Sequence, residues 1–222
     1  TVATNAAASM ISIYLQKTNA MTLNYIVWNP NPVIFELDIP GLGTLAPRWY
    51  GLLFALGFVF GYIIMFRIFR KEGIPIKVLD QLATFMIIAT IIGARLGHVL
   101  FYEPAEYLRN PVDILKVWEG GLASHGAAIA ILIALIWFSR RNKKPYSWIF
   151  DRIAIVVALA GAFIRAGNLM NSEIYGVKTS LPWGFVFVND NPALMEQYRA
   201  GLDLAGFAHH PTQIYEALAY LA

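Results

Sequence analysis

Long apolar runs alternate with short polar segments along this chain. A run of about 17–25 apolar residues is long enough to cross a bilayer as a helix. Four runs approach or reach that length, and a fifth begins after Pro211. The four are Trp49–Phe66, Leu82–Tyr102, Leu122–Phe138 and a run that starts near Ile149. The pattern predicts an all-α polytopic membrane protein with four complete transmembrane helices and the start of a fifth. For the fifth helix, the sequence provides the residues from Pro211 to Ala222.

The polar segments predict small loops and strands outside the membrane. Alternating residues at 33–39 predict a short strand between two turns, and residues 183–189 predict another within a longer loop over 174–209. Residues 103–121 predict a surface loop with a short amphipathic helix. We divide the chain into a polar N-terminal extension, 1–24, and a membrane-embedded domain, 25–222, which we expect to continue beyond the present C-terminus.

Basic residues predict the orientation of these helices. Nine of the 17 Lys and Arg residues lie in two short loops between apolar runs. They are Arg67, Arg70, Lys71 and Lys77 in one loop, and Arg140, Arg141, Lys143, Lys144 and Arg152 in the other. Loops rich in Lys and Arg stay in the cytoplasm. The N-terminus and the 174–209 loop are therefore expected on the outer face.

Composition narrows the classes of function. Hydrophobic residues make up 58% of the chain and charged ones 14%, against about 25% charged in a soluble domain. The absence of cysteine excludes a disulfide, a thiolate metal site and a cysteine nucleophile within this sequence. No basic stretch is interleaved with aromatic residues, so we expect no nucleic-acid partner.

Ionisable and other polar residues in or at the ends of the apolar runs are the candidates for a site, because ionisable residues are costly in lipid and usually face a cavity. Under the predicted orientation they all lie toward the outer half of the membrane. They are Arg95, His98, His125, Arg165, Asn168, Ser172, Glu173, His210 and Glu216. Arg165 and Asn168 share one helix face, which Ser172 is expected to continue. Taken singly, each has a simpler explanation: an arginine can snorkel to headgroups, a histidine can be packed, and an asparagine can join helices.

Several catalytic arrangements are excluded by spacing. Ser124 and His125 are adjacent and point about 100° apart on a helix, so they cannot form a nucleophile–base pair with each other. The four histidines lack the spacing of a helical zinc site. The arrangement that remains is an arginine-bearing pocket suited to a lipid phosphate, with a histidine able to accept a proton.

The glycine pairs Gly57/Gly61 and Gly93/Gly97 predict close helix packing.

One segment carries a family resemblance. Residues 165–176, RAGNLMNSEIYG, resemble the signature of the prolipoprotein diacylglyceryl transferase family. Four further stretches agree with that family in the same order: Trp49–Gly51, Gly93–Gly97 leading to Tyr102, Trp118–Gly121 leading to Gly126, and His210–Glu216. Ile164 and Leu169 depart from the family pattern, which has Gly and Phe at these positions.

The resemblance implies an activity and a set of site residues. It implies transfer of the diacylglyceryl group of phosphatidylglycerol to the lipobox cysteine of a preprolipoprotein, with release of glycerol phosphate and without metal or cofactor. The partners implied are the phosphatidylglycerol, the lipobox peptide and membrane lipids, in a bacterial inner membrane with the site on its outer face. The implied catalytic residues are His125, Arg165 and Glu173. The implied substrate-binding residues are Arg165, Asn168, Asn171, Tyr50, Arg95, Gly176, His210 and Glu216.

Two other functions remain open at this point. A secondary transporter could use Arg95, Arg165 and Glu173 to bind an anionic solute. The clustering toward one surface argues against it, as does the absence of paired broken helices from the sequence pattern. A non-catalytic lipid-binding protein is the second alternative.

Overall fold

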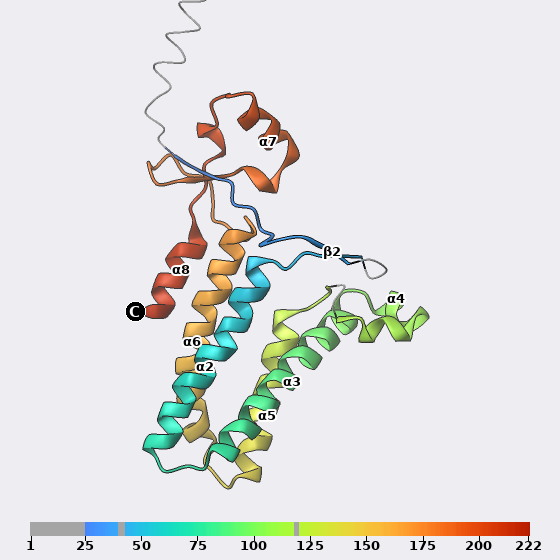
Figure 1. The fold of residues 1–222 in the computed structure, drawn as a ribbon, viewed down its shortest axis with the longest axis vertical. Coiled ribbons are helices and arrows are strands. Elements are labelled where there is room, and N and C mark those ends of the chain that lie inside the picture. Colours follow the sequence, from blue (N-terminus) through green and yellow to red (C-terminus); the bar gives the residue numbers. More distant parts are fainter. Residues whose placement is uncertain (1–24, 40–42, 118–119) are drawn as a thin grey trace, which may run out of the picture. The chain divides into compact units, whose positions relative to one another are not determined.

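The computed structural model of the chain describes residues 25–39, 43–117 and 120–222 (Figure 1). The predicted extension 1–24 and the residues Trp118 and Glu119 lie outside the described residues. The chain forms two compact units. One comprises residues 1–57 with 159–222, and the other comprises residues 58–158. We call them the discontinuous unit and the continuous unit, and we describe each by itself.

Apolar helices dominate both units. Three helices in the described part of the chain are long and apolar enough to cross a membrane. They are α2 (Trp49–Lys71), α3 (Ile76–Phe101) and α6 (Tyr146–Met170). The third predicted run forms α5 (Ser124–Arg141), whose 18 residues include two arginines in the last turn. The run after Pro211 forms α8 (Thr212–Leu221). The structure therefore confirms a mostly helical protein and identifies three candidate spans in the described residues, and the predicted count of four spans and the start of a fifth stays a prediction.

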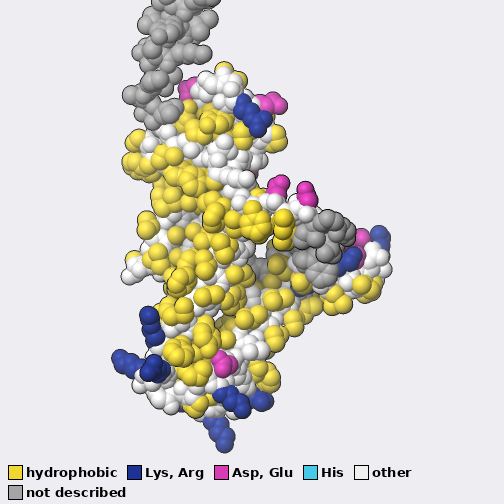
Figure 2. Space-filling model, in the orientation of Figure 1, with side chains coloured by type: hydrophobic (Ala, Val, Ile, Leu, Met, Phe, Trp, Pro, Cys, Tyr) yellow, Lys and Arg dark blue, Asp and Glu magenta, His cyan; other side chains and the backbone are white. Residues whose placement is uncertain are grey.

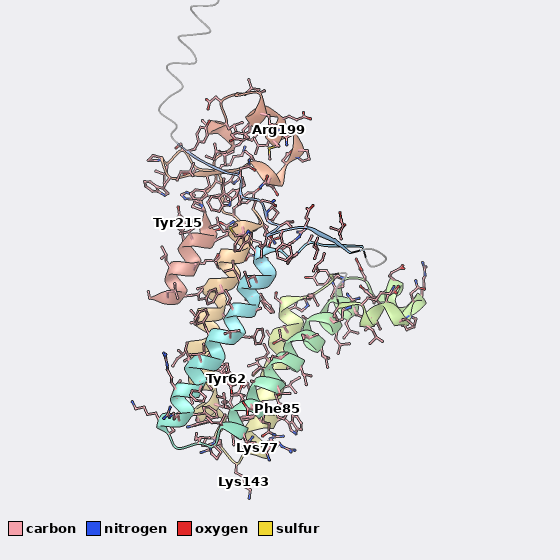
Figure 3. All side chains as sticks on the ribbon, viewed as in Figure 1. Tyr62, Lys77, Phe85, Lys143, Arg199 and Tyr215 are labelled. Atoms are coloured by element: carbon pink, nitrogen blue, oxygen red, sulfur yellow. The ribbon has the colours of Figure 1, made fainter. Side chains whose placement is uncertain are left out.

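The basic loops lie together at one end of the continuous unit. Figure 2 shows Lys and Arg side chains gathered where α2 joins α3 and α5 joins α6, and Figure 3 labels Lys77 and Lys143 there. Arg152 forms an ion pair with Glu72 across the two loops. Beneath them lies a core of buried apolar residues: Met65, Phe69, Leu79, Leu82, Leu135, Phe138, Ile149 and Ile153.

Small residues bring α3 and α5 into backbone contact. A Cβ added at Gly97 would lie 2.7 Å from the Cα of Gly126, so no larger side chain fits. Gly61 on α2 likewise faces Val156 on α6, and an added Cβ would lie 2.5 Å from Cγ1 of that valine, which is too close. The packing role predicted for the paired glycines is confirmed at these positions.

The loop before α5 also carries short helices. α4 (Pro104–Arg109) and the 3-10 helix η1 (Pro111–Leu115) confirm the helix predicted within residues 103–121.

The discontinuous unit holds the strands. β1 (Ile26–Trp28) pairs in parallel with β4 (Phe185–Phe187), which confirms the strand predicted at 183–189. β2 (Leu37–Ile39) pairs antiparallel with β3 (Gly43–Leu45), so the predicted strand at 33–39 is shorter and belongs to a hairpin.

A second core holds these elements together. It contains Tyr25, Val186, Val188, Leu194, Leu204 and Ala208. The sequence did not predict α7 (Pro192–Arg199) or the 3-10 helices η3 (Val188–Asp190) and η4 (Ala205–Phe207), which complete residues 174–209.

Candidate functional site

The C-terminal end of α6 folds back on itself. The helix ends at Met170, and Ser172 adopts a left-handed conformation with φ 57°. The amide of Glu173 donates to the carbonyl of Asn168 at 3.0 Å, and that of Ser172 donates to Leu169 at 3.1 Å. This is the Schellman pattern of helix termination. The prediction that Ser172 continues the helical face is therefore wrong, because the helix has already ended.

The fold-back brings four predicted site residues into one network. Arg165 Nη1 donates to Asn168 Oδ1 at 3.3 Å, as the shared helix face predicts. The side-chain amides of Asn168 and Asn171 both donate to Glu173 Oε1, at 2.9 and 3.1 Å. A single carboxylate oxygen therefore fixes both asparagines, and Asn168 links that carboxylate to the arginine.

Helix α8 closes this network from another part of the chain. Glu216 Oε2 lies 2.7 Å from Arg165 Nε in an ion pair. The side-chain amide of Gln213 donates to the backbone carbonyl of Glu173 at 2.7 Å. Pro211 occupies the N-cap position of α8. Gln213 and Glu216, three residues apart on this helix, therefore both contact residues at the end of α6 or just after it.

Other predicted residues support the same region. Tyr50 packs on Gly167, where an added Cβ would lie 2.7 Å from its ring. The amide of Gly176 donates to the carbonyl of His210 at 2.8 Å. The imidazole of His210 in turn lies 3.2 Å from the hydroxyl of Tyr215.

Three polar atoms in this region have no hydrogen-bond partner among the described residues. They are Asn171 Oδ1, Ser172 Oγ and Gln213 Oε1, all buried. Buried polar atoms are nearly always hydrogen-bonded. All three can accept a hydrogen bond, so water or a hydroxyl-bearing ligand would satisfy them.

In the continuous unit, His125 lies at the beginning of α5. Its imidazole is exposed and lies beside the rings of Phe101 and Tyr102, at centroid distances of 5.1 and 5.8 Å. No hydrogen bond to this imidazole occurs within the described ranges of the chain. The ring is thus open to a partner from outside.

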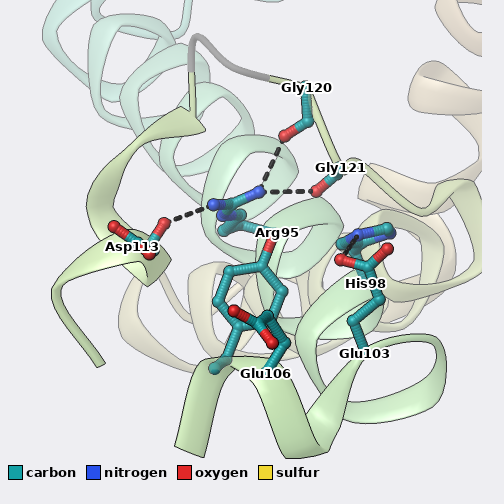
Figure 4. A pocket seen from close by; sticks show the side chains of 8 residues that line it. Arg95, His98, Glu103, Glu106, Asp113, Gly120 and Gly121 are labelled. Atoms are coloured by element: carbon teal, nitrogen blue, oxygen red, sulfur yellow. Dashed lines mark hydrogen bonds and ion pairs between the residues drawn. The ribbon is translucent and has the colours of Figure 1, made fainter. Parts of the chain in front are cut away.

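Arg95 and His98 share a face of α3, as their spacing predicts, but their partners differ. His98 lies 3.4 Å from the carboxylate of Glu103. Arg95 is 4% exposed, and its guanidinium donates to backbone carbonyls (Figure 4). A cavity of about 310 Å³ adjoins both residues, and its lining is Arg95, His98, Glu103, Glu106, Tyr107, Asp113, Gly120 and Gly121.

The sequence interpretation missed the residues around Arg95. Asp113 supplies a backbone carbonyl, and Tyr107 places its ring 4.9 Å from the guanidinium carbon. The two consecutive glycines, Gly120 and Gly121, were the one sequence signal of an unusual backbone here, and both adopt positive φ in the structure.

A further cluster was also missed in the 174–209 segment. The hydroxyl of Tyr175 donates to Asp190 at 2.5 Å, and this hydrogen bond raises the pKa of Tyr175 to about 12. Tyr175 also stacks on Phe187.

The candidate residues thus form two groups, one in each unit. Arg165, Asn168, Asn171, Glu173, Gly176, Tyr50, His210 and Glu216 belong to the discontinuous unit, and Arg95 and His125 belong to the continuous one. The structure brings the members of the first group together. That the two groups form a single site stays a prediction.

These features define a class: a polytopic membrane protein with a polar network built at the end of an apolar helix. The family model described as "Prolipoprotein diacylglyceryl transferase" matches residues 36–222. The chain belongs to this family.

Three relatives are named phosphatidylglycerol–prolipoprotein diacylglyceryl transferase. The protein of Tolumonas auensis is 46% identical over 198 residues, which cover 89% of this chain and 69% of the relative. That of Porphyromonas gingivalis is 47% identical over 200 residues, covering 89% and 67%. That of Cereibacter sphaeroides is 38% identical over 195 residues, covering 84% and 93%. The family predicted from the motifs is confirmed.

Proposed function

We propose that this chain transfers the diacylglyceryl group of phosphatidylglycerol to the cysteine thiol of prolipoproteins. Family membership supports the reaction class and both substrates. The observation that carries the assignment of the site is the network of Arg165, Asn168 and Glu173, closed by Glu216. An arginine in this setting can bind a phosphate through charge-assisted hydrogen bonds.

The reaction needs a base and an anion-stabilising group. In the proposed step, the thiol sulfur forms a bond to the terminal glyceryl carbon of the diacylglyceryl group. The bond between that carbon and the phosphate oxygen breaks, and glycerol phosphate leaves with the electron pair. The thiol proton passes to His125, because a thiol of pKa about 8.5 is a weak nucleophile until it loses its proton. Arg165 stabilises the charge that develops on the departing phosphate.

The remaining residues of the first group bind and orient the headgroup. Glu173 holds Asn168 and Asn171, and Asn168 holds Arg165, so one carboxylate sets the geometry of the phosphate-binding side chain. Glu173, expected among the catalytic residues, acts through Asn168 on this ground and is a positioning residue. Tyr50, Gly176, His210 and Glu216 complete the walls of the binding site. The unpartnered acceptors near Glu173 offer hydrogen bonds to glycerol hydroxyls.

We further propose that residues 25–222 form one transferase domain in the bacterial inner membrane. Helices α2, α3, α5 and α6 would span the bilayer, and α8 would begin a fifth span. The basic loops would face the cytoplasm and the 174–209 segment the outer side. Reporter fusions at Lys71 and Lys143 test this orientation, and an external location at either position would reverse it.

Direct assay tests the function. The protein expressed from its complete reading frame, in vesicles of phosphatidylglycerol, is expected to convert a lipobox peptide to its diacylglyceryl thioether, detected by mass spectrometry. A peptide with serine in place of cysteine is the matched control. Uptake of glycerol phosphate into the vesicles without any thioether product would instead favour the transporter alternative. Lipid binding with neither product nor uptake would favour the non-catalytic one.

A further inference from the structure

Arg95 uses its guanidinium to hold a loop. Nε donates to the carbonyl of Ile114 at 2.9 Å, and Nη2 donates to that of Asp113. Nη1 donates to the carbonyls of Gly120 at 2.7 Å and Gly121 at 3.2 Å. Every nitrogen of the side chain therefore has a neutral backbone acceptor. Four of its five N–H groups are used in this way, so a phosphate could form a bidentate pair with this arginine only by displacing a carbonyl.

Local backbone conformation provides these acceptors. Asp113 and Ile114 lie in the last turn of η1, where the carbonyl of Asp113 accepts from the C-cap amide of Lys116 and, with its second lone pair, from Arg95. Gly120 and Gly121 have φ of 95° and 68°, a region that side-chain-bearing residues rarely adopt. A Cβ at Gly121 would lie 2.7 Å from Nη1 of Arg95. The glycine pair thus wraps closely around the guanidinium (Figure 4).

The loop leads directly into the helix that carries His125. Ala123, two residues after Gly121, is the N-cap of α5, and its amide donates to the carbonyl of Ala94 on α3 at 2.9 Å. His125 follows in the first turn and lies beside Phe101 at the end of α3. Arg95 therefore fixes the chain immediately before α5, and the hydrogen bond to Ala94 fixes the N-cap residue Ala123.

We propose that Arg95 is a positioning residue, which places His125 by holding the loop before α5 and does not itself contact the lipid. This revises the direct lipid contact expected from the sequence, and it rests on the proposed role of His125 as base.

The first test separates catalytic rate from lipid binding. Arg95→Lys keeps the positive charge but cannot reach four carbonyls from one ammonium group. Misplacing a catalytic group by about 1 Å can cost on the order of 10²-fold in rate. We expect kcat for diacylglyceryl transfer to fall by about that factor, with KM for phosphatidylglycerol changed by less than about twofold. A large rise in KM with kcat unchanged would show direct lipid contact and overturn the proposal.

A double variant tests whether the effect passes through His125. If Arg95 acts by placing that imidazole, the Arg95→Lys/His125→Gln variant has the same rate as His125→Gln alone. Independent, additive losses in the double variant would contradict the proposal.

The second test does not depend on activity. Hydrogen–deuterium exchange in phosphatidylglycerol nanodiscs is expected to quicken over residues 120–127 in Arg95→Lys, while residues 168–176 keep the wild-type rate. Unchanged exchange over 120–127 would overturn the holding role even if transfer is lost. Conversely, absence of transfer in the wild type would remove the proposed function, and the exchange result would still decide the role of Arg95.

A glycine variant breaks the same contact with Arg95 intact. Gly121→Ala is expected to reduce kcat and quicken exchange as Arg95→Lys does. Gly73→Ala is the matched control, since Gly73 has a similar φ of 66° but nothing within 4 Å of an added Cβ. Near-wild-type kcat in Gly73→Ala, with loss in Gly121→Ala, assigns the effect to crowding of the added Cβ against Arg95 and His98 and not to backbone strain. Equal loss in both would overturn that assignment. If Arg95→Lys fails to fold, this glycine pair carries the test.

Discussion

Arg95 and Arg165 both lie near the ends of apolar helices, but they have different partners. Arg95 is 4% exposed and donates to backbone carbonyls. The side chain of Arg165 is 24% exposed, and its partners are the side chains of Asn168 and Glu216. No partner for Nη2 of Arg165 occurs within residues 25–39, 43–117 and 120–222. An intramembrane arginine therefore does not by itself indicate an anion site, and its partners show which arginine can receive one.

The two sets of partners also differ in how easily they are exchanged. Arg95 is buried, and a buried charged donor left without acceptors costs more than the roughly 1–3 kcal/mol of a neutral group, so Arg95 cannot leave its carbonyls without a large cost. A partly exposed ion pair such as Arg165–Glu216 contributes about 0–1 kcal/mol. A lipid phosphate could replace Glu216 on Arg165 with little loss of stability.

The largest expected effect is at His125. His125→Gln should lower diacylglyceryl transfer by about 10²–10⁴-fold, the usual contribution of a general base. The protein should still insert, because the imidazole is exposed and packs only on ring edges. Transfer is measured with a lipobox peptide at neutral pH. A near-normal rate would contradict the role of His125 as general base and would favour a packing role for this histidine.

Arg165→Lys comes next and tests the comparison of the two arginines directly. Lysine retains the charge but loses the planar fork, so we expect transfer to fall by about 10²–10³-fold, as for loss of a group that stabilises a developing anion. Arg67→Lys, at an exposed position near the C-terminal end of α2, is the control and should keep its activity. Full activity in Arg165→Lys would show that this arginine needs only its charge, as a snorkelling anchor does.

A smaller effect is expected at Asn168. Asn168→Ala removes one hydrogen bond to Arg165 and one to Glu173, each worth about 0.5–1.5 kcal/mol. Phosphatidylglycerol binding, measured by titration in detergent, should weaken by roughly 10-fold, since 1.4 kcal/mol corresponds to a factor of ten. Unchanged binding would mean that Arg165 is oriented by Glu216 alone.

Helices α2, α5 and α6 all end with a residue in the left-handed conformation. This residue is Gly73 after α2, Lys143 after α5 and Ser172 after α6. Non-glycine residues in this conformation cost about 1 kcal/mol or more. Ser172→Gly and Lys143→Gly should each raise stability to thermal unfolding by about 1 kcal/mol. A gain in Lys143→Gly but not in Ser172→Gly would indicate that the buried hydroxyl of Ser172 compensates for its backbone.

The sequence predicted what depends on local pattern. Apolar runs gave the long helices, the spacing of Arg165 and Asn168 gave their contact, and Pro211 marked the start of α8 within one residue. The partners of Arg95 were not predictable, because any residue can offer a backbone carbonyl and no side-chain pattern marks it. The turn at Ser172 was hidden for a related reason, since a non-glycine residue rarely signals positive φ. The β1–β4 pairing joins three-residue strands that lie far apart in the chain.

That pairing has a consequence for biosynthesis. Ile26 pairs with Phe185, and Trp28 donates its indole N–H to the carbonyl of Leu169, so the early strand has no partner until translation has passed residue 187. Residues 58–158 emerge as one uninterrupted stretch, which at about 5–20 residues per second takes the ribosome several seconds to make. The segment that carries His125 can therefore fold before strand β4, the pairing partner of β1, has been synthesised. The arginine network at the end of α6 is completed only when Glu216 has been synthesised.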